Sequence, residues 1–302
     1  MKVANAPCSW GVLEFDSTAL APKPSQVLDE IAATGYAGTE LGDWGFLSTD
    51  PHQLRADLAS RNLSLLAAFV PVALTDPAAH AVGEDSAIRT ARLLSAASPA
   101  GSTDQPLIVL SDATAAVAAR TAEAGRITAD AGLDEKAWDV VAAGAERIAE
   151  AVFDATGVHT VFHHHCATYV ETPDEIEALM RRTSPDLLGL CLDTGHATYG
   201  GGDPAALIAR YRDRIRHVHF KDCAPAVAAR ARAEGWDYLT AIRHGLFCEL
   251  GAGQVDFRAV LNQLRDIGYD GWIVVEQDVL PSMGSPAASA ARNRRFLERM
   301  GL

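Results

Sequence analysis

Four side chains that suit a divalent metal ion each close a short apolar run in the second half of the chain. They are His163, Asp193, His219 and Glu276, and the runs are HTVFHHH, LLGLCLDTGH, RIRHVHFKD and GWIVVEQD. Imidazole and carboxylate ligands together suit a divalent cation such as Mn, Co, Zn or Fe. The pattern therefore predicts a metalloenzyme.

The elements that would position these residues are short apolar runs that alternate with amphipathic stretches along the whole chain. Strands are expected near residues 2, 36, 63, 106, 158, 187, 215 and 271. Helical spacing lies between them, as in 24–35, 135–157 and 256–268. Eight strands alternating with eight helices predict an α/β protein with a (β/α)8 TIM barrel, as a single domain over residues 1–302. Irregular stretches are expected over 95–106, 111–134 and 222–255, and the last is long enough for a functional loop.

In such a barrel the residues that act on a substrate lie at the carboxyl ends of the strands, where all four metal candidates fall. Alternation along a strand puts His217, His219 and Lys221 on one face, which we expect to face the barrel interior. By the same alternation His163 and His165 point together, whereas the histidine between them points away.

Other polar and aromatic residues near the expected strand ends extend the candidate site. We expect catalytic roles for Glu40, His165, His196 and Lys221, and substrate contacts from Trp10, Trp44, His217 and Glu249. A structural ion pair is an equal alternative for Glu40, and packing of the barrel mouth is the alternative for the two tryptophans. Glu249 and Glu14 are weaker candidates, because each is also explained as an ordinary loop carboxylate. Burying so much polarity without a cation or a ligand would be costly, which favours the metal site.

This residue set predicts chemistry next to a carbonyl group. A cation bound to a ketone or hydroxyl oxygen acts as a Lewis acid, so the neighbouring C–H becomes acidic and an enediolate can form. A carboxylate or imidazole then removes the proton. Loss of a β-hydroxyl gives dehydration, whereas return of the proton elsewhere gives isomerisation or epimerisation. The sequence offers a base and an acid and leaves their assignment open among Glu40, His165, His196 and Glu249.

Composition excludes several other classes of protein. The formal charge of −13, without a basic stripe, argues against nucleic acid as a partner. No apolar stretch is long enough for a membrane helix, and the N-terminal residues lack the features of a signal peptide, so we expect a cytoplasmic protein. The five cysteines are spread out without a CxxC pair and are expected to be reduced thiols. No GxGxxG follows the first strand, which argues against a nicotinamide cofactor.

Several segments resemble one known superfamily over nearly the whole chain. GTELGDWGF, VFHHHCATYVETPDEIEALM, LLGLCLDTGHATYGGGD, HVHFKD and YDGWIVVEQD are similar to the xylose-isomerase-like barrels, which include sugar isomerases, epimerases and dehydratases. Within that superfamily they look most like the inosose (2-keto-myo-inositol) dehydratases. The resemblance implies metal ligands of the types Glu, Asp, His and Glu, which correspond to His163, Asp193, His219 and Glu276. The first position departs from the pattern, so either His163 or His165 takes the place of the glutamate.

The resemblance implies a metal-dependent lyase that dehydrates 2-keto-myo-inositol or a related keto-cyclitol or keto-sugar in inositol catabolism. The first alternative is a metal-dependent isomerase or epimerase acting on a ketose or keto-cyclitol, because a shared fold fixes the site more firmly than the substrate. A metal-dependent endonuclease and a non-catalytic sugar-binding barrel are weaker alternatives. The superfamily also implies a homodimer or homotetramer, in which the C-terminal segment 281–302 could serve as a docking helix.

Overall fold

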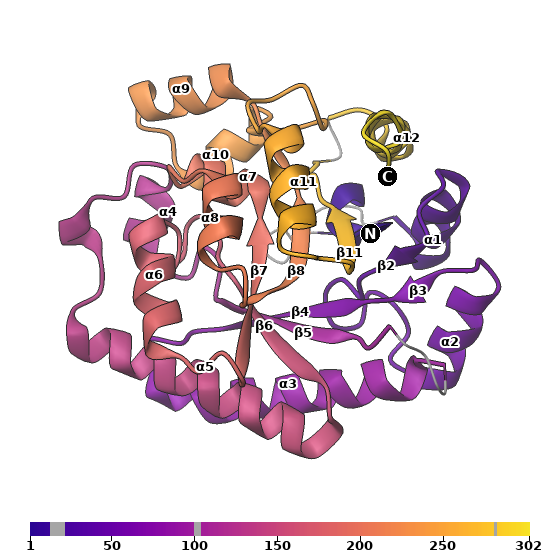
Figure 1. The fold of residues 1–302 in the computed structure, drawn as a ribbon, viewed down its shortest axis with the longest axis horizontal. Helices are drawn as coiled ribbons and strands as arrows, with labels where there is room; N and C mark the ends of the chain where they lie inside the picture. The colour runs from indigo at the N-terminus through magenta and orange to yellow at the C-terminus, as the bar shows by residue number, and fades with distance from the viewer. Residues whose placement is uncertain (13–21, 100–103, 281–282) are drawn as a thin grey trace.

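A cylinder of parallel strands occupies the centre of the computed structural model, which describes residues 1–12, 22–99, 104–280 and 283–302 (Figure 1). The strands of the cylinder are β1 (Lys2–Asn5), β2 (Gly38–Thr39), β3 (Ser64–Leu65), β4 (Ala67–Val72), β5 (Leu107–Asp112), β6 (His159–His163), β7 (Leu188–Asp193), β8 (Ile215–Phe220) and β11 (Trp272–Val275). They follow one another in the order β3-β2-β1-β11-β8-β7-β6-β5-β4. All eight expected apolar runs therefore form strands of one sheet.

The cylinder closes within the third apolar run, which the structure divides into β3 and β4. The amide of Leu66, between them, donates to the carbonyl of Thr39 at 3.0 Å, and the amide of Leu107 donates to the carbonyl of Leu66 at 2.9 Å. One residue thus joins β2 on one side and β5 on the other. The predicted (β/α)8 TIM barrel is confirmed, and the ninth strand arises from this single break.

Helices surround the cylinder, and most begin where the sequence supplies a cap and a proline. They are α1 (Pro24–Ala33), α2 (Pro51–Ala59), α3 (Pro77–Ala97), α4 (Ala118–Glu123), α5 (Glu135–Thr156), α6 (Pro173–Arg182), α7 (Thr194–Tyr199), α8 (Pro204–Arg210), α9 (Pro225–Glu234), α10 (Tyr238–Arg243), α11 (Phe257–Asp266) and α12 (Pro286–Arg299), with short 3-10 turns η1 (Pro7–Trp10) and η2 (Ala129–Ala131). Asp50, Asp76 and Thr172 accept hydrogen bonds from first-turn amides, the usual role of an N-cap. The long helices α3 and α5 lie side by side along the lower edge of Figure 1.

The expectation of a long irregular loop over 222–255 was wrong. This stretch contains α9, α10 and a small antiparallel sheet of β9 (Asp222–Cys223) and β10 (Phe247–Cys248). The carboxylate of Asp222 explains much of this order, because it accepts hydrogen bonds from the amides of Cys223, Gly251, Gly253 and Val255 at 2.8–3.1 Å. The stretch 111–134 is also more regular than expected and contains α4 and η2.

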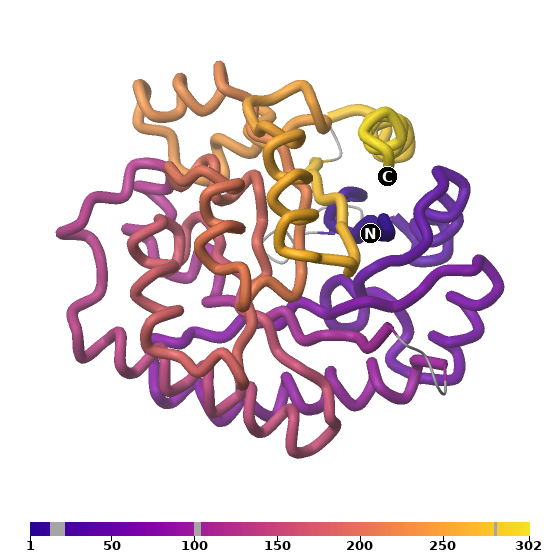
Figure 2. The backbone as a smooth tube through the Cα atoms, in the orientation of Figure 1, coloured from indigo at the N-terminus to yellow at the C-terminus, as the bar shows by residue number. Residues whose placement is uncertain are grey.

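Segments near the two ends of the chain lie side by side (Figure 2). β1 pairs with β11, and α12 packs against η1 and α1. Arg294 on α12 donates from Nε to the carbonyl of Gly35 at 3.0 Å. The C-terminal helix is therefore part of the barrel's outer layer. Among the described helices, none has the length and apolar character needed to cross a membrane.

Strand alternation separates the core into an outer and an inner layer. Outward side chains such as Phe162 and Leu192 pack against the helices. Inward side chains such as Val161, Cys191 and Val274 form a separate buried cluster inside the cylinder. The metal candidates His163, Asp193 and Glu276 lie two positions after these three residues. The same alternation therefore points them into the barrel interior, at the carboxyl ends of the strands.

Candidate active site

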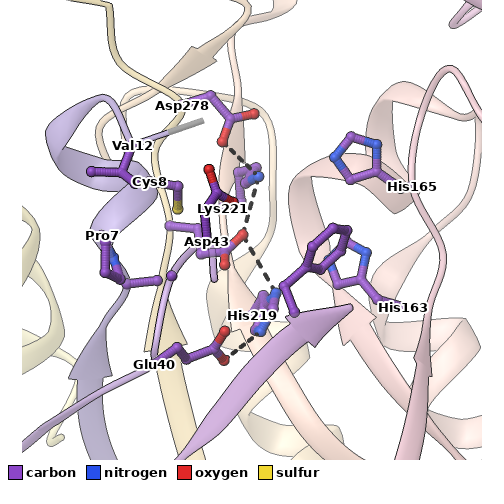
Figure 3. A pocket seen from close by; sticks show the side chains of 14 residues that line it. Pro7, Cys8, Val12, Glu40, Asp43, His163, His165, His219, Lys221 and Asp278 are labelled. Carbon is purple, nitrogen blue, oxygen red and sulfur yellow. Dashed lines mark hydrogen bonds and ion pairs between the residues drawn. The ribbon is translucent and has the colours of Figure 1, made fainter. Parts of the chain in front are cut away.

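A cavity opens at the carboxyl ends of the strands (Figure 3). Its lining combines acidic, basic and imidazole groups with a few apolar side chains. The lining residues are Ala6, Pro7, Cys8, Val12, Glu40, Gly42, Asp43, Phe69, His163, His165, His219, Lys221, Glu276 and Asp278. Six of the residues expected in the site from sequence therefore line one cavity, at the end of the barrel where catalytic groups gather.

The four expected metal ligands converge beside this cavity, and His163, His219 and Glu276 also line it. One ligand atom each of His163, Asp193, His219 and Glu276 lies within 4.8 Å of the others. Oδ2 of Asp193 is 3.8 Å from Nε2 of His163 and 3.9 Å from Nδ1 of His219. Nδ1 of His219 is 3.4 Å from Oε2 of Glu276. Three neighbouring strands and the residue after β11 thus bring imidazole and carboxylate groups to one point.

Hydrogen bonds on the far side of two ligands fix their orientation. Asp193 is the N-cap of α7, and its Oδ1 accepts from the amide of His196 at 2.7 Å. Its other oxygen, Oδ2, is left facing the cluster. His219 contacts Oε1 of Glu40 through Nε2 at 2.9 Å, which leaves Nδ1 facing the cluster. Burial by itself would raise the pKa of Glu40. The neighbouring His219 and His217 outweigh burial and lower this pKa to about 2, so the carboxylate stays charged.

The cluster fits a divalent cation. Oδ2 of Asp193 and Nδ1 of His219 are buried and have no hydrogen-bond partner among the described residues. Leaving such atoms unpaired in a protein interior is costly, and a cation between them would satisfy both. Of the two histidines that could replace a glutamate at the first position, His163 belongs to the converging group and His165 does not.

Lys221 links the cluster to a second carboxylate. Its Nζ lies 3.0 Å from Oδ1 of Asp278, 3.2 Å from Oε2 of Glu276 and 3.1 Å from Nε2 of His196. Burial lowers the pKa of Lys221, but Asp278, Glu276 and Asp193 outweigh this effect and hold it well above the usual value. The lysine is therefore a fully buried ammonium group at the cavity wall.

His165 presents an uncharged ring to the cavity. Its Nδ1 lies 2.6 Å from the carbonyl of Cys166, a contact in which Nδ1 must carry the proton. The other ring nitrogen, Nε2, then keeps its lone pair. Burial, with smaller effects from His163 and Lys221, holds the pKa of His165 well below its usual range. His164 is excluded from the cavity, as expected, and its Nε2 accepts from the amide of Asp193 at 3.2 Å.

The four residues expected to contact substrate all lie outside the cavity lining. Trp10 is buried and donates from Nε1 to Glu30 at 2.6 Å, so it packs η1 against α1. Trp44 is 40% exposed, with Arg89 stacked on its ring. Glu249 pairs with Arg292 of α12 at 2.5 Å. His217 lies on the barrel interior face, as expected, and its Nε2 contacts Glu40 at 2.7 Å. The structure thus does not bring these four into the cavity lining, and Glu14 lies outside the described residues.

Two carboxylates of the cavity were missed in the sequence. Asp278 lies two residues after Glu276, and the alternation used for His219 and Lys221 would have found it. Asp43 follows β2 and lines the cavity with Glu40. No periodic signal marks Asp43, because it belongs to a turn and not to a strand.

Comparison with known proteins identifies the class of protein. A family model described as xylose isomerase-like TIM barrel matches residues 28–300. The chain belongs to this family.

Curated relatives named inosose dehydratase are similar to the chain over nearly its whole length. An inosose dehydratase from Geobacillus kaustophilus is 31% identical over 301 residues, which cover 99% of this chain and 94% of the relative. An inosose dehydratase from Lactiplantibacillus plantarum is 30% identical over 295 residues, which cover 97% of this chain and 94% of the relative. These relatives support an enzyme that acts on sugar-like molecules.

Solved structures share the fold at lower identity. An L-ribulose 3-epimerase superposes with a TM-score of 0.69 at 18% identity and covers 99% of this chain and 94% of its own. The probable 3-DHS dehydratase of Bacillus anthracis also has a TM-score of 0.69, at 14% identity, and covers 99% of both chains. At these identities the likeness shows the barrel fold.

Proposed function

We propose that this protein is a metal-dependent lyase that removes water from 2-keto-myo-inositol or a closely related keto-cyclitol. The observation that carries the proposal is a pair of buried ligand atoms, Oδ2 of Asp193 and Nδ1 of His219, that have no hydrogen-bond partner among the described residues and lie near the buried ammonium group of Lys221. Full-length relatives named inosose dehydratase support the choice of reaction.

The residues that would hold the metal are His163, Asp193, His219 and Glu276. We propose Mn or Co, with Mg, Zn and Fe as further candidates, since the donors are imidazoles and carboxylates. Such a cation supplies Lewis acidity that polarises the carbonyl group of the substrate. Glu40 holds His219 in the orientation that this site requires, as carboxylates commonly do for histidine ligands.

The side chains around this centre have complementary protonation states. His165 is the proposed base, because its Nε2 is unprotonated and its ring lines the cavity. Lys221 stabilises the negative charge that develops when the C–H proton leaves, and His196 helps to place its Nζ. Burial is the main effect that raises the pKa of Asp278, which accepts a hydrogen bond from Lys221 through Oδ1; in its protonated form Asp278 would donate a proton to the departing hydroxyl group.

Isomerisation or epimerisation of a ketose or keto-cyclitol is the second candidate. The observation that favours it is the placement of two proton carriers, His165 and Asp278, on different walls of the same cavity (Figure 3). Removal of a proton by one group and its return by the other would invert or move a centre without loss of water. The L-ribulose 3-epimerase among the solved relatives shows that the fold accommodates this outcome.

The reaction type is tested by mass spectrometry of the product. Chelator-treated protein is incubated with 2-keto-myo-inositol before and after addition of Mn or Co. We expect a product lighter by one water only after the metal is restored. His165→Asn should lower kcat by about 100-fold or more, the usual contribution of an acid–base residue. His52→Asn, on the exposed surface of α2, is the matched control and should retain full activity. A product of unchanged mass would favour the isomerase, and turnover unaffected by chelation would contradict the metal site.

A further inference from the structure

Most carboxylates that line the cavity contact a basic side chain. Glu40 contacts His217 and His219, Glu276 contacts His219 and Lys221, and Asp278 contacts Lys221. Among the described residues, Lys221 is the one lysine or arginine that lines the cavity. Its ammonium group is already engaged by two of these carboxylates.

Asp43 is the exception among the cavity carboxylates. Within the described part of the chain, no hydrogen bond or ion pair joins its carboxylate to another group. Burial raises the pKa of Asp43, and no neighbouring cation counters this effect. A half-buried carboxylate of this kind has lost part of its hydration without gaining protein donors. Hydrogen-bond donors from a bound molecule would replace the water molecules that the carboxylate of Asp43 has lost.

The backbone holds Asp43 in place at the cavity. Gly42 has a positive φ of 71°, and a Cβ atom there would approach Pro7 Cγ at 3.0 Å. This position of the turn therefore favours glycine, and the turn packs against η1. The carbonyl of Asp43 accepts from the amide of Phe46 at 2.9 Å, which closes the turn on the other side. Asp43 is thus presented to the cavity by a fixed turn and not by a free loop.

We propose that Asp43 is a specificity-determining residue that accepts hydrogen bonds from the hydroxyl groups of an uncharged, polyhydroxylated substrate and disfavours substrates that carry a carboxylate or phosphate. The inference rests on the proposed function, since the ligand is the keto-cyclitol of that reaction. An ionised carboxylate only accepts hydrogen bonds, so hydroxyl donors match it. An anionic substituent beside it would meet like charge, without a free lysine or arginine of the cavity lining to offset the repulsion.

The test compares two ligands that differ by one phosphate, myo-inositol and myo-inositol 1-phosphate. Their dissociation constants are measured by calorimetry on Mn-loaded wild-type protein, Asp43→Asn and Asp43→Ala. Asp154→Asn, an exposed carboxylate of α5, is the matched control. Kinetics with 2-keto-myo-inositol separate KM from kcat in the same variants, and circular dichroism verifies the fold of each.

We expect both Asp43 variants to bind myo-inositol about tenfold more weakly or worse, the change that 1.4 kcal/mol produces, while binding of the phosphate stays the same or tightens. KM for the keto-cyclitol should rise while kcat changes less. A ratio of the two dissociation constants that shifts by less than tenfold would overturn the inference, as would wild-type protein that prefers the phosphate or binds neither ligand. The binding ratio does not depend on turnover, so a failure of the proposed dehydration is seen separately, as the absence of water loss.

Discussion

Oε1 of Glu40 lies 2.9 Å from Nε2 of His219, and this contact joins the end of β2 to β8 across the barrel. Because Nε2 is the ring nitrogen that faces Glu40, Nδ1 is the nitrogen that faces Asp193 and Glu276 and is available to a cation there. Glu40 also contacts His217 at 2.7 Å, so one carboxylate orients two imidazoles. In this geometry the clearest role of Glu40 is to position His219, the alternative that the sequence left open.

Replacing Glu40 by glutamine should weaken metal binding without removing any ligand. The amide lacks the charge that favours the required tautomer of His219, and loss of such a partner commonly costs about 10- to 100-fold in metal affinity. Titration of the chelated protein with Mn or Co, followed by calorimetry, measures this change. Glu249→Gln removes a carboxylate of the same type at the ion pair with Arg292, outside the cavity, and is the control. Equal metal affinity in Glu40→Gln and wild-type protein would contradict the positioning role.

Asp193 combines two functions that substitution can separate. Oδ1 caps α7, whereas Oδ2 faces the proposed metal. Asp193→Asn keeps a capping oxygen and should lose metal uptake and activity with little loss of stability. Asp193→Ala should lose the same activities and also about 0.5–2 kcal/mol of unfolding free energy, the usual effect of removing an N-cap. Bound metal is measured by elemental analysis and stability by urea unfolding. Full activity in either variant would refute the assignment of Asp193 as a ligand.

His164 should make the metal-free protein less stable as the pH falls. Burial, followed by the effect of His163, lowers the pKa of His164 from 6.5 to about 3. Below pH 6.5, His164 therefore binds a proton in the unfolded chain but stays neutral in the folded protein. The free energy of unfolding falls as the pH decreases from 6.5 toward about 3. The expected slope from this residue is about 1.4 kcal/mol per pH unit. Urea unfolding of chelated wild-type protein and His164→Gln at several pH values measures it. A slope that is the same in both proteins would show that His164 is not the residue responsible.

Gly195 should be needed for the placement of Lys221. A Cβ atom at position 195 would lie 2.6 Å from Cγ and 2.8 Å from Cβ of Lys221, much closer than carbon atoms pack. Gly195→Ala should therefore displace the lysine and destabilise the protein by about 1–3 kcal/mol, as overpacked interiors do. It should also reduce kcat although residue 195 does not line the cavity. Ala197→Ser, a small enlargement elsewhere on α7, is the comparison variant. A stable, fully active Gly195→Ala protein would show that Lys221 has more room than the structure indicates.

The barrel could be predicted because each strand is a short apolar run in the sequence. Along each strand, side chains that face the barrel interior alternate with side chains that face the helices. The same alternation predicted that His217, His219 and Lys221 share the interior face, and that His164 is turned away from His163 and His165. It also predicted the convergence of four metal candidates, since parallel strands end at the same rim of the barrel.

The remaining features depend on contacts between distant segments, which no local pattern contains. From the sequence, Trp10 is a candidate for contact with a sugar ring. In the structure its Nε1 donates to Glu30 at 2.6 Å, a contact between distant segments. From the sequence, Glu249 is a candidate active-site acid. In the structure it forms an ion pair with Arg292 on the C-terminal helix. The order of 222–255 depends on the carboxylate of Asp222, which gathers backbone amides up to Val255. Asp43 was missed because a turn residue follows no period.

The central claim is that the cluster around His219 serves a metal-dependent dehydration. Proton NMR of 2-keto-myo-inositol in deuterated water, with chelated and with Mn- or Co-reconstituted protein, tests it most directly. We predict loss of the substrate signals and appearance of a diketone only with the reconstituted protein. Deuterium exchange beside the carbonyl without loss of water would contradict dehydration and indicate an isomerase or epimerase. Conversion at the same rate in the chelated protein would contradict the role of the metal.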